Sequence, residues 1–124
     1  MAKTKSLVND KAYAFSIRIV KLYQYLVVEK KEWVLAKQLL RSGTAIGALI
    51  EEAIGGESDA DFKHKLKVGY KEARETHYWI RLLRDTDYLN DIQSESILND
   101  CEELIKMLTS IINTMNQKST TINY

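Results

Sequence analysis

Six side chains that could contact an anion recur at spacings of three and four residues within segment 62–83: His64, Lys67, Lys71, Arg74, Tyr78 and Arg81. On a helix this spacing places all six, here called the basic stripe, on one face. Lys and Arg neutralise phosphates and Tyr stacks on unpaired bases, so the stripe is a candidate nucleic-acid surface. The alternative is an ordinary solvated helix face, because acidic residues are interspersed and the net charge is only +1.

A metal site is the next chemistry to consider. Four glutamates could face one another across two helices: Glu51, Glu52, Glu72 and Glu75. Helical bundles that bind two metal ions add Glu-x-x-His pairs, whereas here His77 follows Glu75 by only two residues. Glutamates near Lys and Arg more commonly form solvated ion pairs. We therefore predict no metal site and no cofactor.

Catalysis and membrane insertion also lack sequence support. Cys101 lies on an apolar stripe, where a buried thiol behaves as a small hydrophobic group, and no glycine-rich loop opens a helix in a phosphate-binding pattern. We predict no catalytic residue and no enzymatic activity. A single cysteine, no signal-like N-terminus and no apolar run long enough to span a bilayer predict a cytoplasmic protein without membrane contact.

Four heptad-like seams predict the elements that position these residues. The apolar positions are Ala12, Phe15, Ile19, Leu22 and Leu26; Leu35, Leu39, Ser42, Ile46, Leu49 and Ala53; Phe62, Leu66, Gly69, Ala73, Thr76, Ile80 and Leu83; and Ile97, Cys101, Leu104, Leu108, Ile111 and Met115. The fold class is all-α: a single domain, 1–124, forming an antiparallel up-down-up-down four-helix bundle with long helices. We expect helices over roughly 9–29, 32–55, 59–86 and 91–117, with 118–124 as a frayed tail.

Capping residues and charge agree with these boundaries. We expect Asn9 or Asp10 to cap the first helix and Ser58 or Asp59 to cap the third, and Asn90-Asp91 serves between the third and fourth helices. Residues 1–41 carry nine basic and three acidic groups, whereas residues 87–124 carry two basic and six acidic groups. We expect these oppositely charged segments to be neighbouring helices.

A second stripe beside the seam broadens the apolar arc of the first two helices. Such arcs are either thick packing within one chain or surface reserved for another subunit, and we favour homo-oligomerisation. Gly43 and Gly47, four residues apart within a helix, would let another helix approach closely. The candidate helix–helix or subunit contacts are Gly43, Gly47, Ile50, Ile54, Tyr13, Val20, Tyr23 and Val27.

Three segments carry a family resemblance: QLLRSGTAIGALIEEA (38–53), KEARETHYWIRLL (71–83) and DYL (87–89). They resemble the four-helix-bundle family of 23S rRNA intervening-sequence proteins, whose relatives are the accessory variability proteins of diversity-generating retroelements. The resemblance extends from about Asn9 to Gln117, and its most specific part is the Arg-Ser-Gly-Thr-x-Ile-Gly-Ala segment that begins at Arg41.

The resemblance implies a bacterial, cytoplasmic, non-enzymatic bundle whose protomers form a ring, a homopentamer with a central channel. Its retroelement relatives bind nucleic acid and a reverse transcriptase through a strongly basic exterior. This chain differs from them in its acidic fourth helix, so ring assembly transfers better than nucleic-acid binding. We expect a homo-oligomeric structural or adaptor module. The alternative is an accessory protein that binds RNA or DNA through the basic stripe, with a reverse transcriptase or another protein as a further partner.

Overall fold

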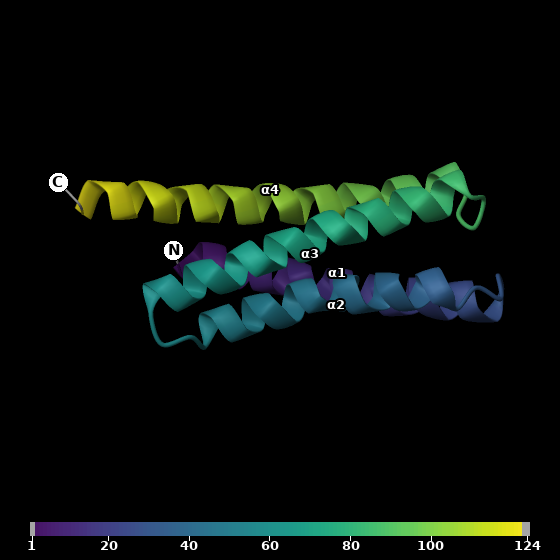
Figure 1. Ribbon diagram of the computed structural model, residues 1–124, viewed down its shortest axis with the longest axis horizontal. Coiled ribbons are helices and arrows are strands. Elements are labelled where there is room, and N and C mark those ends of the chain that lie inside the picture. Colours follow the sequence, from purple (N-terminus) through teal and green to yellow (C-terminus); the bar gives the residue numbers. More distant parts are fainter. Residues whose placement is uncertain (1, 123–124) are drawn as a thin grey trace.

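The computed structural model describes residues 2–122, with side chains described for residues 3–117. This part of the chain forms four α-helices and no strand: α1 (Ala2–Val28), α2 (Val34–Ile54), α3 (Asp59–Asp85) and α4 (Asp91–Ile122). The α1–α2 and α3–α4 connections lie at one end of the molecule, and the α2–α3 connection lies at the other end with the start of α1 and the end of α4 (Figure 1). The fold is the predicted all-α bundle with antiparallel consecutive helices.

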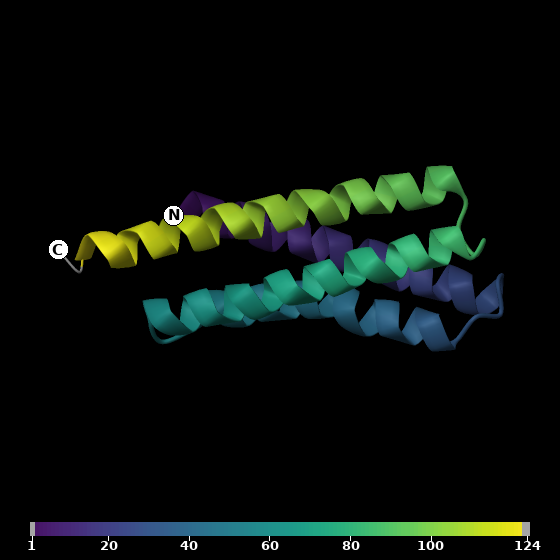
Figure 2. The same ribbon diagram turned by 45° about the horizontal axis from the view of Figure 1, so that its top comes forward.

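Two helices are longer than the sequence predicts. α1 begins at Ala2 rather than near residue 9, so Asn9 and Asp10 lie inside the helix and do not cap it. The early start has a packing reason, because Val8 is buried in the core and the Lys5 ammonium lies 4.4 Å from the centre of the Phe62 ring. α4 continues to Ile122 instead of ending near residue 117, and its last turns extend past the neighbouring helices (Figures 1 and 2). Residues 123–124 of the predicted frayed tail lie outside the described residues.

The predicted seams form the core. Every seam residue of α3 and α4 is buried, and so are the seam residues of α1 and α2 except Leu22, Leu35 and Leu49, which are half-buried. Full burial of one Leu, Ile or Phe side chain stabilises the fold by about 1.5–3 kcal/mol. This shared core of all four helices fixes which face of α3 turns outward.

Side-chain hydrogen bonds cap the N-termini of three helices. The Ser58 hydroxyl accepts a hydrogen bond from the Asp61 N–H (3.0 Å), as predicted for an N-cap. Asn90 and Gln93 form a reciprocal capping box, each side chain accepting from the other's N–H (2.8 and 3.0 Å). The Glu32 carboxylate, which the sequence did not suggest, accepts from two N–H groups in the first turn of α2.

The two helical glycines of α2 face α1 of the same chain. A Cβ added at Gly43 would lie 2.8 Å from side-chain carbons of Ile19. At Gly47 it would lie 3.0 Å from Ser16 Oγ and 3.4 Å from the Ala12 carbonyl oxygen. These glycines therefore let α1 and α2 approach closely, and this packing offsets the roughly 1 kcal/mol helix-propensity cost of each glycine.

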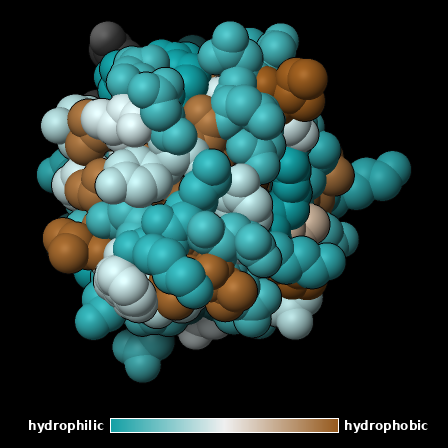
Figure 3. All heavy atoms as spheres, turned by 90° about the vertical axis from the view of Figure 1, so that its right-hand side faces the viewer, coloured by the Kyte–Doolittle hydropathy of each residue, from teal (hydrophilic) through white to brown (hydrophobic). Residues whose placement is uncertain are grey.

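Hydrophilic side chains are spread over the face of the molecule that Figure 3 shows. At the end that carries the α1–α2 and α3–α4 connections, hydrophobic side chains are separated by hydrophilic ones in the view of Figure 3. Along the length of the bundle, α1 and α4 are joined by two ion pairs, Lys11 with Glu103 and Arg18 with Asp100. These contacts are of the kind predicted from the opposite charges of the two segments. Among the described residues, no helix has the length and apolarity needed to cross a membrane.

Candidate nucleic-acid interface

The basic stripe faces outward along α3. The core seam of α3, which includes Phe62, Ala73 and Ile80, faces inward. All six stripe residues are exposed on the other side of the helix. Tyr78 is 50% exposed, and the Arg81 guanidinium carbon lies 5.8 Å from the centre of its ring, within cation–π range. The stripe is therefore available to a partner over the whole length of α3.

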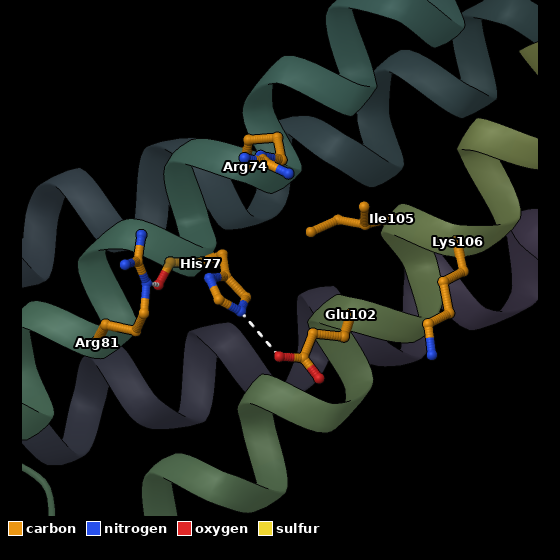
Figure 4. Close-up of a pocket in the computed structure, with 6 residues that line it drawn as sticks. All are labelled: Arg74, His77, Arg81, Glu102, Ile105 and Lys106. Atoms are coloured by element: carbon orange, nitrogen blue, oxygen red, sulfur yellow. Dashed lines mark hydrogen bonds and ion pairs between the residues drawn. The ribbon is translucent and has the colours of Figure 1, made fainter.

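Two stripe residues line a cleft between α3 and α4. The α3–α4 cleft has a volume of about 400 Å³ and is formed by Arg74, His77 and Arg81 from α3 and by Glu102, Ile105 and Lys106 from α4 (Figure 4). His77 points across to α4, where its Nε2 lies 3.0 Å from Glu102 Oε1. This contact links the two helices at the cleft.

Positive charge in the α3–α4 cleft exceeds the negative charge of its one carboxylate, Glu102. Arg18, Arg41 and Arg84 each pair with an acidic side chain. Among the side chains that the structure describes, Arg74, Arg81 and Lys106 form no ion pair. The Arg81 Nε donates a hydrogen bond to the His77 carbonyl oxygen at 3.4 Å, and the guanidinium acts on the Asp85 carboxylate by charge without forming an ion pair with it. These three cations are therefore free to bind an external anion.

A second hollow continues along the same seam. It has a volume of about 360 Å³ and is lined by Lys67, Tyr70 and Lys71 from α3 and by Thr109, Ile112 and Asn113 from α4. The sequence contains no Asp or Glu after Glu103, so no acidic residue of α4 faces these lysines. Four of the six stripe residues thus line the α3–α4 seam, whereas His64 and Tyr78 lie outside both hollows.

On the side of α3 that faces α2, two glutamates form ion pairs with one arginine. Arg41 of α2 contacts the carboxylates of Glu72 (3.1 Å) and Glu75, and Trp79 Nε1 donates to Glu75 at 2.9 Å. The Trp79 hydrogen bond, followed by the interactions with Arg41, lowers the pKa of Glu75. These glutamates, considered above as metal ligands, are engaged by Arg41. Within the described residues no group of three or more potential ligands is placed to hold a metal ion.

The predicted helix–helix or subunit contacts lie in three different places. Gly43 and Ile50 are buried inside the bundle, and Tyr23 and Val27 pack against the margin of the core. The exposed members are Tyr13 (71%), Val20 (39%) and Ile54 (41%). The sequence reasoning missed Ile17, which is 44% exposed and shares the outward face of α1 with Tyr13 and Val20. Gly47 lies in a groove of about 470 Å³ between α1 and α2, together with Asn9, Asp10, Tyr13, Ser16, Ala48 and Glu51.

The sequence reasoning also missed four residues of the α3–α4 cleft: His77, Glu102, Ile105 and Lys106. Three of them belong to α4, and a stripe analysis of α3 alone contains no information about the facing helix. One signal was present, because Lys106 is one of only two basic residues in 87–124 and follows all six acidic residues of that segment.

Known proteins resemble this chain along most of its length. A family model described as 23S rRNA-intervening sequence protein matches residues 4–110. A crystal structure of a protein with unknown function from the S23 ribosomal protein family of Bacteroides thetaiotaomicron VPI-5482 has a TM-score of 0.87 to this structure and 52% sequence identity, covering 89% of this chain and 98% of that chain. No curated protein matches the chain.

Proposed function

The chain belongs to the 23S rRNA-intervening sequence protein family, and from this premise we propose that it is a non-enzymatic, self-associating four-helix bundle that acts as a structural or adaptor module. The one solved relative described above is itself of unknown function. The proposal therefore depends on the surface of this chain, and one feature of α1 carries it.

That feature is the apolar outer face of α1. Tyr13, Ile17 and Val20 recur at spacings of four and three residues, so at about 100° per residue they lie on one face. The opposite face of α1 is buried through Phe15 and Ile19. Apolar side chains clustered on the outward face of a helix add nothing to the core of a lone bundle, and such clusters mark interaction surfaces.

A second copy of the chain is the partner that we propose for this face. The groove beside it has small residues, Gly47 and Ala48, on the α2 side, which leaves about 470 Å³ for an incoming side chain. Self-association also agrees with the ring that the family resemblance implies, for which a homopentamer is the expected size. In such a ring the α1 face of each protomer contacts a different surface of the next protomer, so every interface depends on this face.

A non-catalytic role agrees with the state of the only thiol. Burial raises the pKa of Cys101 to about 12, and its Sγ contacts the Ala73 carbonyl oxygen at 3.4 Å. A thiol with such a pKa stays protonated and is a poor nucleophile at neutral pH. A reduced, buried cysteine also agrees with the proposed location in the cytoplasm.

Light scattering coupled to size-exclusion chromatography tests the proposal. We expect the wild-type mass to be a multiple of the 14.3 kDa protomer at micromolar concentration. The double variant Ile17→Asp, Val20→Asp should shift the mass to that of the protomer while the helical circular-dichroism signal is retained. Ile92→Asp is the matched control, because Ile92 is 82% exposed at the start of α4 and lies off the α1 face. A monomeric wild-type protein would refute self-association.

Nucleic-acid binding is a second candidate function. The specific observation in its favour is that four cations of the basic stripe line the α3–α4 seam and that Arg74 and Arg81 have no ion pair among the described side chains. It remains second because the net charge of the protomer is only +1.

Fluorescence anisotropy with single-stranded RNA and DNA at several salt concentrations tests this candidate. We expect affinity to fall steeply with salt and to be lost in the double variant Arg74→Glu, Arg81→Glu. Lys37→Glu, on the exposed surface of α2, is the control and should bind nearly as the wild type does. Binding that is absent at low salt, or unchanged in the double variant, would exclude the basic stripe as a nucleic-acid surface.

A further inference from the structure

The charge of the α3–α4 cleft suggests more than a contact with a nucleic-acid backbone. Its lining holds three cations, Arg74, Arg81 and Lys106, and one carboxylate, Glu102, so these four charged groups leave two positive charges. A backbone phosphodiester has one negative charge. A phosphate monoester has an average charge of about −1.5 to −2 at pH 7, because its second pKa is about 6.

The cations line the cleft from both helices. Arg74 and Arg81 are seven residues apart, so their backbone positions differ by roughly 10 Å along α3. Lys106 completes the lining from α4. Guanidinium groups bind phosphate oxygens in pairs through parallel N–H donors, and Lys adds a point charge.

The volume of the cleft exceeds that of a bare phosphate ion. About 400 Å³ lies in the range of clefts that hold small organic ligands. Ile105 points into this space, and the imidazole ring of His77 lies at its edge (Figure 4). These groups offer apolar and flat surface to an organic group that carries the phosphate.

We propose that the α3–α4 cleft binds a phosphate monoester attached to an organic group of about nucleotide size. The chemistry has two sources, a free mononucleotide or the 5′-phosphorylated end of a nucleic-acid strand. This site is independent of self-association through α1, and it differs from backbone binding along the basic stripe because it recognises the terminal phosphate.

Glu102 has a defined part in this site. Its carboxylate is the one negative group of the lining and would repel a phosphate, but His77 holds one of its oxygens at 3.0 Å. Glu102→Gln keeps an oxygen that can accept from His77 and removes the negative charge. This variant should therefore bind the monoester a few-fold more tightly than the wild type.

Two matched pairs of probes test the proposal. Calorimetry compares uridine 5′-monophosphate with uridine, and anisotropy compares two 3′-labelled RNA oligonucleotides that differ only in a 5′-phosphate. We expect the phosphorylated member to bind more tightly in at least one pair, and the pair that discriminates identifies the source. Equal binding of both members in each pair, or no binding in any, would overturn the proposal. Equal binding of the two oligonucleotides with a steep salt dependence would at the same time support the backbone candidate.

Substitutions locate the site. We expect the affinity for the phosphorylated probe to fall about tenfold in each of three variants, Arg74→Ala, Arg81→Ala and Lys106→Ala. This is the loss expected when a charge-assisted contact is removed. The Lys106→Ala variant is decisive, because Lys106 lies on α4 and is not part of the basic stripe. Lys37→Ala, on α2, is the control. Discrimination that persists unchanged in Lys106→Ala would place the monoester elsewhere and overturn the proposal.

Discussion

α3 packs against α2 on one side and α4 on the other, and the two sides differ in their treatment of charge. On the α2 side Arg41 binds the carboxylates of Glu72 and Glu75, and a buried hydrogen bond of 2.9 Å joins Thr76 to Ser42. On the α4 side Arg74 and its neighbours line an open cleft with unpaired positive charge. Polar groups on the α2 side are satisfied within the chain, whereas those on the α4 side are available to a ligand.

The difference indicates that one side of α3 contributes to stability and the other side is available for binding. A polar group whose partners lie within the chain stabilises the fold or is neutral, and it offers little to a ligand. Charges without internal partners add self-repulsion and solubility, so a cluster of them within one cleft is better explained by binding than by stability. Substitutions in the packed seams of α2 should therefore change stability more than substitutions in the α3–α4 seam.

The largest effect is expected from Gly43→Leu in the seam between α2 and α1. The first carbon of the new side chain would lie 2.8 Å from Ile19 side-chain carbons, and both positions are fully enclosed. Overpacking of this kind destabilises by about 2 kcal/mol or more, and it exceeds the roughly 1 kcal/mol gained when a helical glycine is replaced. Urea unfolding followed by circular dichroism measures the loss.

Gly69→Ala is the matched control for that substitution. At Gly69 an added Cβ would lie 3.8 Å from the Leu49 Cβ, which is an ordinary van der Waals distance. Here the helix-propensity gain should dominate, and we expect a stabilisation of about 0.5–1 kcal/mol. If Gly43→Leu is as stable as the wild type, the close approach of α1 and α2 is not required by the fold.

We expect a smaller effect on stability from substitutions of Arg41, and a still smaller one from substitutions of Arg74. Arg41→Gln removes a cation shared by two carboxylates and leaves Glu72 and Glu75 one helical turn apart without it, so we expect a loss of about 1 kcal/mol. Arg74→Gln removes an unpaired cation and should change stability by less than about 0.5 kcal/mol. Thermal unfolding of the two variants compares them directly. Equal losses would show that the charges on the two sides of α3 contribute alike.

The sequence predicted the fold well because the fold depends on local periodicity. Spacings of three and four placed Phe62, Leu66 and Ile80 on the buried face of α3. The same periodicity says which residues share a face but not which helix that face meets. For this reason Gly43 could not be assigned to α1 or to another subunit from the sequence, and the pairing of His77 with Glu102, 25 residues away, was not foreseen.

The start of α1 shows a second limit. Asn9 is a favourable N-cap residue, and the sequence therefore placed the helix start there. In the structure Val8 of the preceding turns is buried in the core, Lys5 lies over the Phe62 ring of α3, and the helix continues through Asn9. Tertiary packing of this kind overrides a local capping preference, because helix stability in proteins comes mainly from packing.

The smallest predicted effect is an acid dependence on the α2 side of α3. The folded state lowers the pKa of Glu75, first through the Trp79 N–H and then through Arg41, so this carboxylate adds stability above its unfolded pKa of about 4.3. That contribution is lost as the pH falls through the lower, folded pKa. Because the Glu75 side chain is 35% exposed, solvent screening should limit the effect to less than about 1 kcal/mol.

Urea unfolding at pH 7, 5, 4 and 3 measures this contribution against Glu75→Gln, which keeps an oxygen acceptor for Trp79 and does not titrate. We expect the wild type to lose more stability than the variant between pH 5 and pH 3. Trp79→Phe removes the larger cause of the pKa shift and should reduce the wild-type acid dependence while leaving Arg41 in place. Identical acid dependence in all three proteins would mean that Glu75 titrates alike when folded and unfolded. The ion pairs of Glu75 on the α2 side of α3 would then add no more to stability than the cations without ion pairs add on the α4 side.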